Sequence, residues 1–363
     1  MNIRAKCIMA TGMVAGFLLV GQASAAALSC TGPITLPPPA TTTIQYGDAL
    51  SYSLNLLGYD VRSQPGDIND CVVILTGASG NPVNQNFTGM DDAYHAPSGS
   101  GGPVYFKTGD PTSSPDPGSS FPAFLGQTAT TWDATLASLR AFTGINDLIV
   151  YFNLNQENSG GATNQNLFIW AQIELVDTAA VNPLVSKFFD FVSTPCAPFG
   201  TNGGCPGGDP TSYNSPGAYS PSLNQMVQAD GKVCLGGTGA IGSPIVPCDG
   251  SGGAVARVIN NNLGADQAAF AVFFPELQAY LNMANFGGYD MLRVSIQYGC
   301  LPGTVGAAVG QACPAGSIQN NGYEQMFLGT ALPVRVPEPS TIALFGLGLL
   351  VMTWGVRRRS VRS

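Results

Sequence analysis

Alternation of apolar and polar side chains constrains the fold of this chain more than any other feature. It runs through residues 148–154, 167–175 and 290–298, and residues 41–57 and 71–75 show a similar pattern. In the third segment Leu292, Val294 and Ile296 fall on one face. A period of two over six or more residues indicates half-buried strands, and turn-forming residues bound each segment. The sequence therefore predicts a mainly β, antiparallel, sandwich-like domain.

Two short segments have helical spacing instead. Thr131 to Phe142 carries Trp132, Leu136, Leu139 and Phe142 at helical spacing, with Thr131 as a cap and a glycine beyond the end. Pro275 to Ala284 has proline in its first turn, Glu276 beside it and its leucines on one face. Helices this short do not hold by themselves, so we expect both to pack against a sheet.

The last residues of the chain form an ordered set of signals. Pro337, Glu338 and Pro339 come first, and the prolines keep this stretch out of helices and sheet ladders. Residues 340–356 follow without a charge, and as a helix they would span roughly 25 Å, near the lower limit for a bilayer core. Arg357, Arg358 and Arg359 then set the topology, with the preceding chain outside. A buried core helix is the alternative, but it does not explain the arginine cluster.

This tail resembles the PEP-CTERM sorting domain of Gram-negative bacteria. Val336 to about Arg359 shows its three parts in order: the Pro-Glu-Pro motif, a short span rich in Leu and Gly, and an Arg cluster. The resemblance implies recognition by exosortase, a membrane-embedded cysteine transpeptidase, and removal of the tail at or near Pro337–Pro339. It further implies an inner-membrane-tethered precursor and then a place at the cell surface or outside the cell. It says nothing about the upstream domain.

The opposite end carries an export signal. Arg4 and Lys6 precede an apolar stretch over residues 7–20, and Ala23-Ser24-Ala25 fits the small-x-small cleavage rule. We expect cleavage before Ala26, or else after residue 27. A lipoprotein would need Cys30 as its first mature residue, but Leu28 and Ser29 do not form a lipobox, and the apolar stretch ends too early.

Eight cysteines remain once Cys7 leaves with the signal peptide. An even number in an exported chain indicates disulfides, although eight cysteines allow 105 pairings. Three pairs are close in sequence and enclose Gly- and Pro-rich loops, which leaves a fourth. The expected pairs are Cys196 with Cys205, Cys234 with Cys248, Cys300 with Cys313, and Cys30 with Cys71. A metal site is the alternative, but no Cys-x-x-Cys occurs and His95 is the only histidine.

The net charge of the predicted extracytoplasmic domain limits the kinds of ligand that it can bind. With the two basic ends set aside, acidic residues outnumber basic ones by more than two to one. This balance argues against nucleic acid and anionic lipid headgroups as ligands, and it fits solubility outside the cell.

We therefore expect three parts: a signal peptide at 1–25, a β-rich extracytoplasmic domain at 26–335, and a sorting domain at 336–363 with a transmembrane helix at about 340–356. A break between two lobes could fall within 178–217, and the Pro- and Gly-rich stretches at 111–122 and 195–217 suit surface loops.

The sequence offers few candidate catalytic residues. It contains no Gly-x-Ser-x-Gly, His-Glu-x-x-His, P-loop or dinucleotide motif, and His95 reads as an exposed loop residue rather than a general base. Asp67, Asp70, Asp91 and Asp92 could contribute to a Ca²⁺ site or be solvated turn acids, and we favour the latter. The sequence predicts no catalytic residue, no metal and no cofactor.

Three function classes remain. A structural or interaction protein of the surface or extracellular matrix follows from what the tail resembles. An exopolysaccharide-binding module is the second class, because Tyr151, Phe168 and Trp170 share the polar side of their strands and could stack on sugars, although we favour core packing for these residues. A secreted hydrolase is the third, because paired carboxylates cannot be recognised from spacing.

Overall fold

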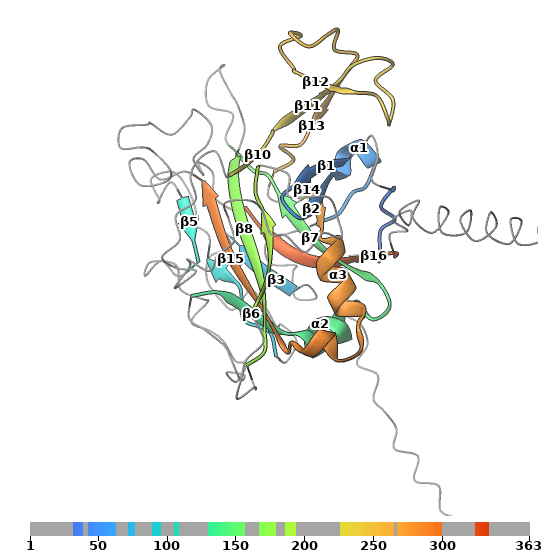
Figure 1. Ribbon diagram of the computed structural model, residues 1–363. Coiled ribbons are helices and arrows are strands. Elements are labelled where there is room, and N and C mark those ends of the chain that lie inside the picture. Colours follow the sequence, from blue (N-terminus) through green and yellow to red (C-terminus); the bar gives the residue numbers. More distant parts are fainter. Residues whose placement is uncertain are drawn as a thin grey trace, which may run out of the picture.

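The protein folds as two antiparallel sheets packed face to face, with a third, small sheet at one end (Figure 1). The computed structural model describes residues 32–38, 43–62, 72–76, 89–95, 105–108, 130–156, 167–178, 186–193, 226–264, 267–299 and 324–333. The predicted mainly β, antiparallel architecture is confirmed.

The first sheet has seven strands. Neighbouring strands in this sheet pair antiparallel, except that β3 and β4 at one edge pair parallel. Their order across the sheet is β1 (Thr43–Tyr46), β2 (Ala49–Ser53), β14 (Ala268–Phe273), β7 (Asp147–Asn153), β16 (Met326–Ala331), β3 (Val72–Thr76) and β4 (Tyr94–His95).

The second sheet has six strands around a long central pair. That pair is β8 (Leu167–Val176) and β15 (Met291–Gly299); β10 (Val227–Ala229) and β9 (Lys187–Phe191) pair with β8, and β5 (Tyr105–Lys107) and β6 (Trp132–Thr135) pair with β15. The small sheet has the order β12 (Ile245–Val246), β11 (Lys232–Leu235) and β13 (Arg257–Asn260).

Strands from both sides of residues 178–217 share each large sheet. In the first sheet β14 lies between β2 and β7, and in the second β15 lies beside β8. Both large sheets therefore form only when the two halves of the chain come together.

The helices differ in part from those predicted. Helix α3 (Pro275–Asn282) is confirmed, with proline in its first turn and Glu276 beside it. A short 3₁₀ helix, η5 (Ala284–Gly288), follows it. The helix predicted from Thr131 begins later, because residues 132–135 pair with β15 as strand β6. Helix α2 is Leu136–Thr143, and its cap is Thr135, whose Oγ1 accepts a hydrogen bond from the Ser138 amide at 3.2 Å.

The prediction of one strand over residues 41–57 is also wrong in part. This segment forms the β1–β2 hairpin and then a short helix, α1 (Leu54–Leu57), which the prediction of two helices missed. Ser53 caps α1 by accepting a hydrogen bond from the Leu56 amide, and Gly58 ends it in a left-handed conformation.

Both faces of the seven-stranded sheet are buried. On one face, Val150 and Phe152 of β7 pack in the core shared with β8 and β15. On the other, Ile149 and Tyr151 pack in a second apolar cluster with Ile34 and Phe327. The strand at 148–154 is confirmed, but the expectation that it is half-buried is wrong.

The β1–β2 turn joins the first sheet to strand β9 of the second. The Asp48 amide donates to the Asp190 carbonyl at 2.9 Å, and the Asp190 amide donates to the Asp48 carboxylate at 2.8 Å. Gly47 has a φ of +60°, and a Cβ there would lie 2.1 Å from the Asp190 oxygen. Only glycine allows this close approach of the two backbones.

The stability of the protein should depend on pH through Asp48. Burial raises the pKa of Asp48 to about 6; the Asp190 amide opposes this shift, and the charge of Glu276 adds to it. A carboxyl whose folded pKa is raised stabilises the fold below its unfolded pKa and loses that contribution as pH rises through the folded value. The loss should fall between about pH 4 and pH 6 and amount to about 1–2 kcal/mol, since solvent screens this half-buried group.

Urea titrations of the wild type and Asp48→Asn across pH 4 to 7 would measure this loss. The asparagine oxygen can still accept the Asp190 hydrogen bond, so the variant should lose less stability over that interval. Parallel pH profiles for the two proteins would contradict the assignment.

The predicted signal peptide and the predicted membrane span lie at opposite ends of the chain. No helix within the described residues is long and apolar enough to cross a membrane. The predicted signal peptide at 1–25 and the predicted span at about 340–356 lie outside those residues.

Candidate functional site

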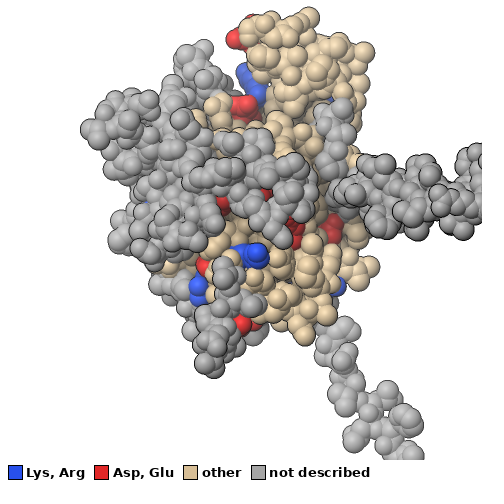
Figure 2. Space-filling view, in the orientation of Figure 1, with Lys and Arg blue, Asp and Glu red and all other residues tan. Residues whose placement is uncertain are grey.

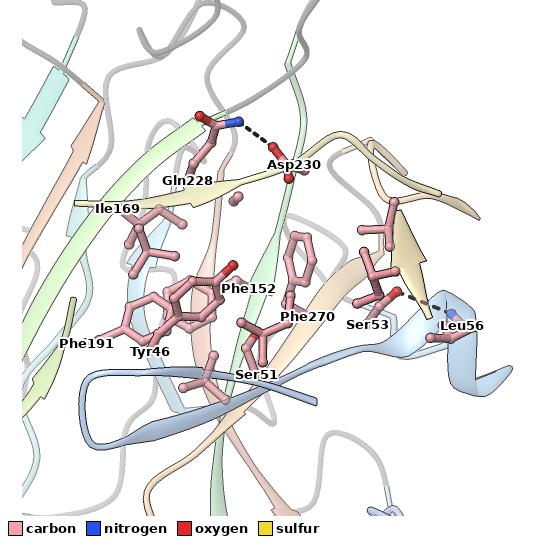
Figure 3. A pocket seen from close by; sticks show the side chains of 16 residues that line it. Tyr46, Ser51, Ser53, Leu56, Phe152, Ile169, Phe191, Gln228, Asp230 and Phe270 are labelled. Atoms are coloured by element: carbon pink, nitrogen blue, oxygen red, sulfur yellow. Dashed lines mark hydrogen bonds between the residues drawn. The ribbon is translucent and has the colours of Figure 1, made fainter. Parts of the chain in front are cut away.

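A cleft opens at one end of the sandwich, where the edges of the two large sheets meet the small sheet (Figure 3). Strands β1, β2, β7 and β14 and helix α1 supply one side, β8, β9 and β10 the other, and β11 and β12 the roof. Its volume is about 60 Å³, several times what one water molecule needs by the same measure. This cleft is our candidate functional site.

The floor of the cleft is aromatic. Phe191 stacks against Phe152 with ring centroids 5.8 Å apart, and Tyr46 meets Phe191 edge-on at the same distance. Figure 3 shows these three rings gathered on one side of the cleft. Such pairs add about 0.5–1.5 kcal/mol each to the burial of the rings themselves, so the floor is a rigid part of the core.

The roof is apolar as well. Val233 of β11 and Ile245 of β12 face the cleft, and Ile245 is 42% exposed. Ile44 of β1, also part of the lining, is 38% exposed. Apolar side chains are therefore accessible from solvent at the mouth of the cleft.

Polar groups are few in the cleft: Tyr46 lies on β1, Ser51 and Ser53 lie on β2, and Gln228 and Asp230 lie on β10 and directly after it. The Gln228 side-chain amide donates a hydrogen bond to the Asp230 carboxylate (Figure 3). Burial raises the pKa of Asp230, and the bond from Gln228 opposes that rise. Burial, with a smaller effect of the Asp230 charge, raises the pKa of Tyr46 to about 12. At neutral pH Tyr46 is therefore a neutral hydroxyl, and the half-buried Asp230 carboxyl group lies in the same cleft.

The small sheet is fixed over the cleft by asparagines at its base. Asn261 is fully buried. Its backbone amide donates to the Gly231 carbonyl at 2.8 Å, and its side-chain oxygen accepts from Ser53 Oγ at 2.8 Å. Asn55 of α1 donates to the Asn260 carbonyl at 2.6 Å. The run of three asparagines at 260–262 is the sequence signal for this anchor, which was not predicted.

A disulfide between Cys234 and Cys248 closes the loop that carries the roof residue Ile245. This pair was predicted and is confirmed. The other six cysteines, Cys30, Cys71, Cys196, Cys205, Cys300 and Cys313, lie outside the described residues, as do the sorting residues Pro337, Glu338 and Pro339 and the arginines 357–359.

The aromatic face suggested for sugar stacking is not an exposed surface. Tyr151 is fully buried and Trp170 is 3% exposed, while Phe168 is half-buried. Core packing, the alternative reading of these residues, therefore accounts for Tyr151 and Trp170. The cleft uses Phe152 instead, the neighbour of Tyr151 on the opposite face of β7.

The interpretation of Asp91 and Asp92 as solvated turn acids is wrong. Both are buried, and the Asp91 carboxylate accepts a hydrogen bond from the Asp133 amide at 2.8 Å. Asp67 and Asp70 lie outside the described residues, and the backbone of His95 ends strand β4. In the part of the chain that the structure describes, no group of three or more His, Cys, Asp or Glu side chains is placed to hold a metal ion.

Comparison with protein families gives two matches. The model of a domain of unknown function, DUF8239, matches residues 34–297, which include most of both large sheets, the small sheet and the cleft. The model of the PEP-CTERM protein-sorting motif matches residues 335–359. No curated protein and no solved structure matches the chain.

Proposed function

Since the chain belongs to the DUF8239 family and ends in a PEP-CTERM protein-sorting motif, we propose that it is a surface or extracellular-matrix protein with a structural or interaction role and no catalysis. The motif implies export, a membrane-anchored precursor and processing by exosortase. The single observation that carries the proposal is this motif at residues 335–359, directly after the last strand of the sandwich.

The short connection between sandwich and motif supports a tethered precursor. Five residues separate Ala331, the end of strand β16, from Pro337, and even a fully extended residue spans only about 3.5 Å, so this connection can reach at most about 20 Å. The folded domain would stay close to the membrane until the tail is removed. Pro337 and Pro339 lack backbone N–H groups, so this stretch suits an extended, unpaired substrate for a transpeptidase.

The disulfide supports export to an oxidising compartment, where such bonds form and persist. Among the described residues on the face shown in Figure 2, charged side chains are sparse and scattered among uncharged ones. This surface suits contact with uncharged partners better than binding to a polyanion.

The cleft supports binding rather than hydrolysis. Among its described lining residues Asp230 is the single carboxylate, whereas most glycoside hydrolases need a pair of carboxyl groups about 5–9 Å apart. Its described lining contains no cysteine, histidine or lysine, and Ser53 donates to Asn261 rather than to a base.

Deleting residues 336–363 should release the protein from its normal location, because the tail would no longer hold the precursor for exosortase. Cell fractionation with intact-mass measurement would follow both the location and the two cleavages. Glu338→Ala tests the motif alone, and it should leave an unprocessed precursor in the membrane fraction. Pro333→Ala, just outside the motif, is the matched control and should be processed normally. The proposal would be abandoned if the tail-deleted protein reached the same place as the full chain.

A further inference from the structure

The charge distribution in the cleft indicates what kind of ligand it takes. Its lining is predominantly apolar, with Phe152, Phe191 and Val272 inside and Ile44 and Ile245 at the mouth. Asp230 is the single charged residue among the described lining residues, and no lysine or arginine lies there to balance it. Asp230 is half-buried, and a carboxylate partly removed from water is costly unless it is paired and hydrogen-bonded.

Among the described lining residues, the Asp230 carboxylate accepts one hydrogen bond and meets no cation. Gln228 donates to Oδ1, which satisfies one oxygen with a neutral amide. Tyr46 and Asp230 line the same cleft, and the carboxylate charge contributes to the raised pKa of the Tyr46 hydroxyl. Neither group neutralises the carboxylate. A cationic donor entering the cleft would supply both the missing charge and a charge-assisted hydrogen bond.

We propose that this cleft binds a small amphiphile with an apolar body and a protonated amine, the amine contacting the Asp230 carboxylate. The body lies between the aromatic floor of Phe152 and Phe191 and the roof formed by Val233 and Ile245. The same charge disfavours apolar ligands with an acidic head, because their carboxylate would meet Asp230 with no cation between them. The cleft thus selects among molecules of equal apolar bulk by the charge of the head group.

A matched series of six-carbon ligands tests the proposal: hexylamine, hexanol and hexanoate, added to the protein as isolated from the exporting cell. Isoleucine methyl signals in NMR report the site, because Ile44, Ile169 and Ile245 line the cleft, while Ile34 and Ile149 lie in the separate apolar cluster. Hexylamine should shift the first three signals and leave the other two unchanged. It should bind at least about tenfold more tightly than hexanoate, the ratio expected from one charge-assisted hydrogen bond.

Asp230→Asn keeps the shape and the Gln228 contact but removes the charge. Hexylamine and hexanoate should then both bind with about the affinity of hexanol. Ser51→Leu places bulk on the half-buried β2 wall of the cleft and should weaken all three ligands together. Equal binding of hexanoate and hexylamine by the wild type would overturn the proposal, as would shifts at Ile149 rather than at Ile245. The head-group series in the wild type decides the matter even if a variant fails to fold, and it does not depend on where sorting delivers the protein.

Discussion

Replacing Gly329 with alanine is expected to destabilise the protein by about 3 kcal/mol or more, the upper range for overpacking a core. Gly329 lies in β16 near the centre of the seven-stranded sheet, opposite Ile149 of β7. A Cβ at this position would lie 2.1 Å from Cε2 of Tyr151. The Tyr151 ring cannot move aside easily, because it is fully buried and packs against Phe327 with centroids 5.2 Å apart.

Urea denaturation would measure the loss, as a lower midpoint with an unchanged slope. Gly32→Ala is the matched control, because a Cβ there meets no atom within 4 Å. The same Gly329→Ala change should cost much less in a Tyr151→Ala background, where the obstructing ring is absent. An additive double-mutant cycle would show that the collision with Tyr151 is not the cause.

Trp132→Ala should cost about 4 kcal/mol, within the range for truncating a buried aromatic side chain. Trp132 is fully buried in the main core, and its indole Nε1 donates a hydrogen bond to the Asp91 carbonyl at 3.2 Å. The substitution leaves a cavity between the sheets and removes the donor from a buried carbonyl group.

Trp132→Phe separates these two effects. It keeps most of the apolar bulk and loses only the N–H donor, so it should cost clearly less than alanine. Thermal unfolding of both variants provides the measurement. Near-wild-type stability of Trp132→Ala would show that β6 contributes little to the sandwich.

Much of the β framework could be predicted, because its strands repeat with a period of two. The strands at 148–154, 167–175 and 290–298 are found as β7, β8 and β15, and Pro275 placed the start of α3 correctly. Trp132 misled the helix prediction because its spacing to Leu136 and Leu139 fits a helix. Pairing with β15 decides the conformation of residues 132–135, and a local pattern does not contain that information.

The burial of both faces of the seven-stranded sheet could have been predicted from the sequence. Ile149 and Tyr151 are themselves apolar, so residues 148–154 form a nearly continuous apolar run, which is typical of strands covered on both faces. A prediction from alternation alone placed Tyr151 on the polar side of its strand. Phe152, its neighbour, points to the opposite face and was therefore left out of the predicted site, although it lines the cleft.

The cleft itself could not be predicted from the sequence. Tyr46, Phe152, Asp230 and Phe270 lie far apart in the chain and meet only because strands from both halves share the sheets. Cys234 and Cys248 were predictable, because a short loop rich in turn residues separates them.

The position of β16 has a consequence for the order of events during export. Ile34 and Ala331 form a parallel bridge, so the described domain begins and ends at one place, and β16 fills the space between β7 and β3. A chain that crosses the membrane from its N-terminus delivers this strand last. In a chain exported unfolded in that direction, the seven-stranded sheet would stay open between β7 and β3 until β16, the last of the described strands, has emerged. The fold would then be completed shortly before the sorting motif at residues 335–359 arrives.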